Sequence, residues 1–198
     1  MTGESYDYSR REDILPISWE DFHGLCKALA LAVEPYAPEI ILPVGRGGYY
    51  PGTLLAHLLR VEVYPVRLSR RVRDEVMHET PQWLQAPPAA VAGKRVLVVD
   101  EISSTGQTLQ MVVEKAGEYG AAESRSAVLY AHSWSVDIPD YIGLISDALL
   151  LNPWDREVLV DGRFIVHPEY AEALTLQDQQ PDASLLIPAT PFAIAKGG

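Results

Sequence analysis

The chain has 198 residues, of which 47% are hydrophobic, and its 16 basic and 27 acidic residues leave a formal net charge of -11 at pH 7. This apolar content is enough to bury the core of one ordinary domain. The excess of acid argues against a surface built to bind nucleic acid, so any phosphate has to be held locally. One cysteine, Cys26, and the absence of an apolar run of roughly 20 residues favour a cytoplasmic protein without a membrane partner.

The first half of the chain alternates helix and strand patterns. Ser18 can cap a helix whose apolar positions recur at helical spacing until Pro35. A short apolar strand is expected at residues 39–44, followed by a glycine-rich turn and a helix that opens at Pro51. Residues 61–68 read as a second strand, whose internal proline favours an edge position.

The second half continues the alternation after a long connection. Residues 69–93 lack a sustained period, and connections of that length often serve as lids. Residues 94–100 form a continuous apolar run, as expected for a strand buried on both faces of a parallel sheet. A helix over residues 108–119 should end at Gly120 in a left-handed cap. Further strands are expected at residues 124–132 and 148–151, which completes an α/β pattern.

The domain prediction follows from these elements. We expect one domain over residues 15–175, preceded by a polar segment at residues 1–14. The tail at residues 176–198 has weak periodicity, which is typical of a flexible or loosely docked segment.

The stretch VLVVDEISSTGQTL, residues 97–110, carries the clearest chemical pattern. A predicted buried strand ends in Asp100 and Glu101, and small hydroxyl residues with Gly106 follow. Ligands of open parallel sheets bind beyond the carboxyl ends of the strands, where the next helix presents free N–H groups. Such a turn can cradle a phosphate, and the two acids suit hydroxyl donors, so a ribose 5-phosphate satisfies both halves. The alternative is that these residues merely cap a helix.

The same stretch resembles the phosphoribosyl diphosphate signature of type I phosphoribosyltransferases. ILPVGRGGYYPGTLLAHLL, residues 41–59, is similar to the pyrophosphate loop of the bacterial xanthine-guanine and hypoxanthine members, and residues 138–155 resemble their purine pocket. The likeness spans residues 18–157 and places the long connection where the family keeps its mobile catalytic loop. It implies a single Rossmann-like domain with a mostly parallel sheet flanked by helices, a small hood region and a mobile loop.

The resemblance also implies roles at the diphosphate end. Asp100 and Glu101 would receive the ribose hydroxyls and, through them or through water, Mg²⁺. The residues expected to wrap the 5-phosphate are Ser103, Ser104, Thr105, Gly106, Gln107 and Thr108. Those expected to meet the pyrophosphate are Arg46, Gly47, Gly48 and Arg71. The residues expected to act in catalysis are Asp100, Glu101, Arg46 and Arg70.

The basic cluster at the start of the long connection contains Arg67, Arg70, Arg71 and Arg73. Closure of a lid would bring one or more of them onto pyrophosphate and exclude water. Acidic neighbours in the same segment offer the alternative of ordinary ion pairs in a solvated loop.

The acceptor site departs from the family pattern. Ser104 stands where hypoxanthine-guanine enzymes typically place an aspartate near the purine N7, and Leu149 stands where an aromatic ring stacks on the base. His132 lies near the position of a lysine that meets the exocyclic oxygen, or it is a satisfied histidine at a strand end. Trp154 and Asp155 would shape the pocket, with simple packing as the alternative for Trp154.

The predicted function is transfer of the phosphoribosyl group from 5-phosphoribosyl 1-diphosphate to a nitrogenous base, favouring a 6-oxopurine, by a homodimer that uses Mg²⁺. Purine salvage would be its role. Two alternatives stay open, namely a regulatory module that binds phosphoribosyl diphosphate without turnover and a transferase for a different base.

Overall fold

We used a computed structural model of the whole chain, which describes residues 11, 13–69, 71–72, 75–76, 80–180 and 186. Contacts divide the chain into two compact units. Among the described residues, the first contains those within 19–147, and the second contains those within 7–18 and 148–198. Across the described part of the chain, no helix combines the length and the apolar content that crossing a membrane requires.

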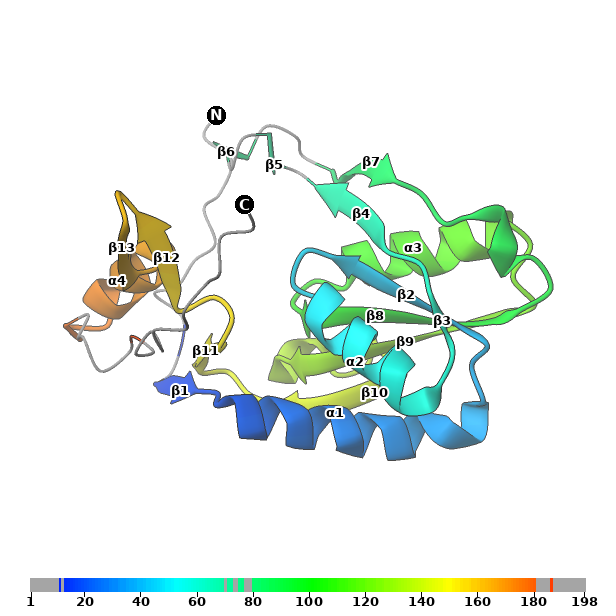
Figure 1. The fold of residues 1–198 in the computed structure, drawn as a ribbon, viewed down its shortest axis with the longest axis horizontal. Helices are drawn as coiled ribbons and strands as arrows, with labels where there is room; N and C mark the ends of the chain where they lie inside the picture. The colour runs from blue at the N-terminus through cyan, green and yellow to red at the C-terminus, as the bar shows by residue number, and fades with distance from the viewer. Residues whose placement is uncertain are drawn as a thin grey trace, which may run out of the picture. The chain divides into compact units, whose positions relative to one another are not determined.

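A mostly parallel sheet forms the centre of the first unit (Figure 1). Its order is β10 (Tyr141–Ile145), β9 (Glu123–Ala131), β8 (Arg95–Ser103), β2 (Ile40–Gly45), β4 (Val66–Ser69) and β7 (Gln82–Gln85), with β3 (Glu62–Val63) also paired to β2. Every pair is parallel except β4 with β7. The predicted α/β class is therefore confirmed, and the two 9-residue strands β8 and β9 lie beside each other within this sheet.

Helices cover both faces of this sheet (Figure 1). They are α1 (Trp19–Val33) with a 3₁₀ turn η2 (Glu34–Tyr36), α2 (Tyr49–Leu59) and α3 (Gln107–Glu118). Successive side chains of β2 point to opposite faces of the sheet and so contact different helices. Leu42 faces α3, because it belongs to the core cluster that also holds Leu109 and Val112 of that helix. The next residue, Pro43, faces Gly52 of α2 on the opposite side.

The region from β3 to β4 differs from the prediction. The expected single strand over residues 61–68 is wrong, because the chain forms two strands with Tyr64 and Pro65 between them. A proline has no N–H for the strand ladder, so pairing is interrupted there. The expected edge position is also wrong for the second piece, since β4 lies between β2 and β7.

The long connection carries more structure than its composition indicates. It contains the antiparallel pair β5 (Arg71–Val72) and β6 (Glu75–Val76), then β7 and a 3₁₀ turn η3 (Ala89–Val91). Its function as a lid stays a prediction.

The described residues of the second unit form two small strand pairs and a helix. The elements are β1 (Ile14–Pro16), β11 (Leu149–Leu151), β12 (Glu157–Val160), β13 (Arg163–Val166) and α4 (Pro168–Leu176). β1 pairs with β11 in parallel, and β12 and β13 form a hairpin whose turn residues Asp161 and Gly162 both have positive φ. The predicted polar segment and tail lie largely outside the described residues.

Candidate functional site

Asp100 lies in the last part of β8, a strand with neighbours on both sides in the sheet. Its side chain is partly buried, and its Oδ1 accepts a 2.8 Å hydrogen bond from the backbone N–H of Glu101. Burial raises the pKa of Asp100 to about 7, although that hydrogen bond opposes the shift. Near neutral pH this carboxyl group can therefore exchange a proton with its surroundings or accept a hydroxyl proton.

The glycine turn after β2 lies against these acids. A Cβ atom on Gly47 would overlap the carboxylate of Glu101, and one on Gly48 would lie 2.6 Å from the carbonyl oxygen of Val99. The backbone contacts at Gly48 require glycine, whereas a side chain at Gly47 would require the Glu101 carboxylate to move. The peptide bond between Gly45 and Arg46 is cis. Two motifs that are far apart in the sequence thus meet at one edge of the sheet.

The start of α3 is open to an anion. Gly106 precedes the helix with φ of 70°, and no side chain caps it. The first turn contains no acidic residue. The N–H of Gln107 is 3.5 Å from Thr105 Oγ1, a long contact at the limit of a hydrogen bond. Backbone donors at a helix N-terminus with this polarity are suited to hold a phosphate.

The hydroxyl residues around this turn are not equivalent. Thr105 is exposed, and Ser104 and Thr108 are partly buried, so their hydroxyls lie where a ligand can meet them. Ser103 ends β8 and is 2% exposed, and its Oγ is buried without a hydrogen-bond partner among the described residues. Its carbonyl oxygen accepts a 2.7 Å hydrogen bond from Ser135 Oγ, which ties the end of β8 to the chain after β9.

His132 follows β9 and is 1% exposed. Its Nδ1 lies 2.8 Å from the carbonyl oxygen of Ser146, and Asp147 Oδ1 lies 3.8 Å away. The ring of Trp134 stacks on it with a centroid distance of 4.5 Å. These contacts satisfy Nδ1, whereas Nε2 is buried and makes no hydrogen bond among the described residues. Both readings of His132, as a satisfied histidine at a strand end and as a donor to a base, therefore stay predictions.

The remaining residues predicted for the base site belong to the second unit. Leu149 is buried in a small core with Leu151 and Tyr170. Trp154 is partly buried, and Asp155 is exposed with its N–H donating to Asn152 O at 3.2 Å. Their contribution to a base pocket therefore stays a prediction.

The loop arginines are only partly described. Arg70 and Arg73 lie outside the described residues, and Arg71 is described only as backbone of β5. Their predicted roles in catalysis and pyrophosphate binding are not tested by the structure.

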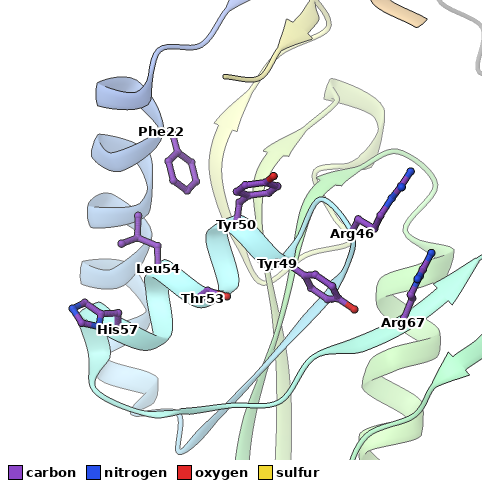
Figure 2. A pocket seen from close by; sticks show the side chains of 8 residues that line it. All are labelled: Phe22, Arg46, Tyr49, Tyr50, Thr53, Leu54, His57 and Arg67. Carbon is purple, nitrogen blue, oxygen red and sulfur yellow. The ribbon is translucent and has the colours of Figure 1, made fainter. Parts of the chain in front are cut away.

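A pocket of about 830 Å³ opens beside the glycine turn on the α2 side of the sheet (Figure 2). Its lining consists of Phe22, Arg46, Tyr49, Tyr50, Thr53, Leu54, His57 and Arg67. Tyr49 had no signal in the sequence pattern, yet its hydroxyl donates a 3.3 Å hydrogen bond to Val66 O. That bond joins the first turn of α2 to β4.

The described residues contain no group of three or more histidine, cysteine or acidic side chains arranged to hold a metal ion. The hard oxygen ligands at this edge are the carboxylates of Asp100 and Glu101, which suit Mg²⁺ when a ligand supplies further oxygens.

A parallel sheet with paired acids, a glycine turn and an uncapped helix N-terminus at one edge is typical of α/β proteins that bind phosphorylated ligands beyond the carboxyl ends of their strands. Comparison with known sequences identifies the family within this class. Residues 25–147 match the sequence pattern of the phosphoribosyl transferase domain. The chain therefore belongs to the phosphoribosyl transferase domain family.

The sequence identity between this chain and individual relatives is low. Hypoxanthine-guanine phosphoribosyltransferase of Saccharomyces cerevisiae is 28% identical over 129 residues, which are 56% of this chain and 58% of that protein. Xanthine-guanine phosphoribosyltransferase of Nitratidesulfovibrio vulgaris is 26% identical over 159 residues, covering 75% of this chain and 89% of the relative. The crystal structure of a purine phosphoribosyltransferase from Pyrococcus horikoshii aligns with a TM-score of 0.66 and 27% identity, over 76% of this chain and 99% of that one.

Proposed function

We propose that the protein transfers the phosphoribosyl group from 5-phosphoribosyl 1-diphosphate to a 6-oxopurine and releases pyrophosphate, as a purine salvage enzyme. The observation that carries this proposal is the close approach of Gly47 to Glu101. It brings the turn suited to pyrophosphate and the acids suited to ribose hydroxyls to one edge of the sheet, as a diphosphate on C1 of ribose requires. The relatives named above, which are purine phosphoribosyltransferases by name, agree with it.

Different residues of this edge bind the 5-phosphate, the ribose hydroxyls and the pyrophosphate of the substrate. The open N-terminus of α3 holds the 5-phosphate, and Asp100 and Glu101 accept the ribose hydroxyls. Breakage of the bond between C1 and the pyrophosphate oxygen leaves a cation-like sugar and increases the negative charge on the leaving group. Arg46 and the N–H groups of its turn stabilise that charge because they are already in place.

Magnesium is part of the proposal. Asp100 and Glu101 would hold it through the ribose hydroxyls or through water, and when bound it neutralises charge on the departing pyrophosphate.

The choice of a 6-oxopurine rests on the relatives, whereas Ser104 and Leu149 favour a second candidate. A serine hydroxyl is a poor general base, and an aliphatic side chain stacks less specifically on a base than an aromatic one. A module that binds phosphoribosyl diphosphate without turnover would tolerate both residues.

The deciding experiment is magnesium-dependent pyrophosphate release from phosphoribosyl diphosphate. Hypoxanthine, guanine, xanthine, adenine, uracil and orotate are offered singly, and the nucleotide product is identified by mass. Release with a 6-oxopurine supports the proposal. Release only with another base changes the acceptor, and tight binding without turnover favours the binding module.

We further propose a homodimer in the cytoplasm. Exposed apolar side chains on α1 and α2, among them Trp19, Leu31, Tyr50 and Leu58, provide surface of the kind that subunit interfaces cover. Sedimentation analysis at micromolar concentration tests the dimer, and a monomer over that range would contradict it. Cell fractionation tests the location.

A further inference from the structure

We infer that Ser135 and Ile138 are positioning residues for the phosphate turn, residues 103–106, which leads from β8 into α3. This inference rests on the proposed function, because it assigns the support of a turn that acts in the same reaction. Its basis is that one segment after β9 contacts this turn twice, at its first residue and at its last.

The phosphate turn has little support of its own. Pairing of β8 with β9 ends at Ser103, so the chain beyond that residue leaves the sheet. No side chain caps α3, and the contact between Thr105 Oγ1 and the N–H of Gln107 is 3.5 Å long. The buried Oγ of Ser103 makes no hydrogen bond among the described residues. Backbone N–H groups bind an anion best when they already point at it, so this turn needs contacts from elsewhere.

Ser135 holds the beginning of the phosphate turn. It ends a short 3₁₀ turn, η4 (Ser133–Ser135), and is 1% exposed. Its Oγ lies 2.7 Å from the carbonyl oxygen of Ser103 and 3.1 Å from that of His132. A hydroxyl group has one proton, and the shorter distance indicates that Ser103 receives it. This hydrogen bond therefore fixes the direction in which the chain enters the turn.

Ile138 holds the end of the phosphate turn. A Cβ atom on Gly106 would lie 2.3 Å from Cγ2 and 2.7 Å from Cδ1 of Ile138, so the isoleucine side chain fills the space beside this glycine. Gly106 has a φ of 70° and directly precedes α3. Glycine has more accessible backbone conformations than any other residue, and a side chain packed against it restricts the turn to one of them.

The supporting segment is itself anchored to the sheet. The N–H of Ser135 donates to the carbonyl oxygen of His132 at 2.9 Å. The N–H of Ser133 donates to Asp147 Oδ1 at 2.9 Å, and His132 Nδ1 lies 2.8 Å from the carbonyl oxygen of Ser146. These contacts join the end of β9 to the chain after β10. The phosphate turn is therefore held by strand ends, which keep a site more precisely than a mobile loop does.

The alternative is that these contacts stabilise the fold alone, and the chain offers matched controls for it. Ser126 is also a buried serine, and its Oγ lies 3.0 Å from Asp140 Oδ2. It pairs with Val98, well before the phosphate turn. Ile142 in β10 is partly buried and packs against the main core, so it is the control for Ile138.

The test measures binding, so it does not depend on turnover. Calorimetry with magnesium present compares ribose 5-phosphate and pyrophosphate on the full-length wild type, Ser135→Ala and Ile138→Ala. The controls are Ser126→Ala and Ile142→Ala. Thermal melting of every variant measures stability in parallel, because loss of a buried hydrogen bond or of packed methyl groups also destabilises the fold.

We expect Ser135→Ala and Ile138→Ala to weaken ribose 5-phosphate by about fivefold to tenfold, since a neutral hydrogen bond has about this magnitude. Pyrophosphate, which lacks the 5-phosphate, should bind both variants as it binds the wild type. Ile138→Val keeps the Cγ2 atom beside Gly106 and should retain most of the affinity. The two controls should lose stability to a similar extent without losing affinity.

Three results would overturn the inference. Unchanged affinity for ribose 5-phosphate in Ser135→Ala or in Ile138→Ala removes the role of that residue. An equal loss in the matched control, or for pyrophosphate, means that the substitution acts through general destabilisation. Absence of ribose 5-phosphate binding by the wild type removes the site.

Failure of the proposed function looks different. The wild type would then bind ribose 5-phosphate without forming a nucleotide from any base. In that case the affinities of the variants still decide the role of the two residues.

Discussion

Charged side chains at the two edges of the central sheet, where its strands begin and where they end, have different partners. At the edge where the strands begin, Glu39 accepts a 3.0 Å hydrogen bond from Lys94 Nζ and another of 3.1 Å from the N–H of Arg95. Arg125 donates to Glu123 at 2.8 Å. At the edge where the strands end, the partly buried carboxyl of Asp100 accepts a hydrogen bond from the backbone N–H of Glu101, and no cation pairs with it among the described residues.

The difference separates charges that serve the fold from charges that serve a ligand. Ion pairs between exposed side chains contribute little stability and need nothing from outside. A buried acid without a counter-charge raises the free energy of the folded state, so it persists where function requires it. Substitutions at the edge where the strands end should therefore change ligand binding and activity, whereas those at the opposite edge should change stability alone.

The largest effect should come from removing both acids at the ligand edge. The variant Asp100→Asn with Glu101→Gln loses the acceptors for the ribose hydroxyls, and we expect kcat/KM for phosphoribosyl diphosphate to fall by about a thousandfold. Steady-state pyrophosphate release measures this. Unchanged calorimetric affinity for phosphoribosyl diphosphate would show that the ribose site lies elsewhere.

The next effect should come from the glycine turn. Gly47→Ala places a methyl group where the Glu101 carboxylate lies, so the turn and the acid must separate, and we expect about a hundredfold loss of kcat/KM.

Gly24→Ala on α1 is the matched control, because a Cβ there meets nothing within 4 Å. It should keep full activity and gain about 0.5–1 kcal/mol of stability as a helical alanine. Equal activity of the two variants would contradict the contact between turn and acid.

A smaller, pH-dependent effect should appear in stability. Burial raises the pKa of Asp100 from 3.8 to about 7, so between these values the folded state holds a proton that the unfolded state has released. Stability is therefore lost as the pH rises through this window. Asp100→Asn cannot ionise, and since the side chain is only partly buried we expect it to gain about 2 kcal/mol over the wild type at pH 8.

Urea denaturation at pH 4, 6 and 8 measures this difference. The advantage of Asp100→Asn should shrink toward zero near pH 4. A difference that does not change with pH would mean that the carboxyl group of Asp100 is solvated like an ordinary acid.

The smallest effect should come from the opposite edge. Lys94→Gln removes one member of the exposed pair with Glu39, and the melting temperature should fall slightly with kcat/KM unchanged. Calorimetric melting and the pyrophosphate assay test both parts. A large loss of activity in Lys94→Gln would contradict the proposed difference between the two edges of the sheet.

Local patterns were enough for the elements whose signals lie in neighbouring residues. The apolar run before Asp100 and the later Gly106 predicted a buried strand, a turn and a helix. β8 and α3 lie at the predicted positions. Gly120 has the positive φ expected of a helix cap. The hairpin of β12 and β13 was missed, although its Asp161–Gly162 turn is a known signal.

The sequence by itself determined the α/β alternation, the acids at the end of a buried strand and the glycine-containing turn before α3, because periodicity and turn chemistry act over a few residues. Only the tertiary structure decided that Gly47 lies against Glu101 and that Arg67 stands beside the same turn. It also placed His132 under Trp134 with its Nδ1 on a carbonyl oxygen. Such contacts join residues far apart in the chain, and strand order and register set them, which no local pattern contains.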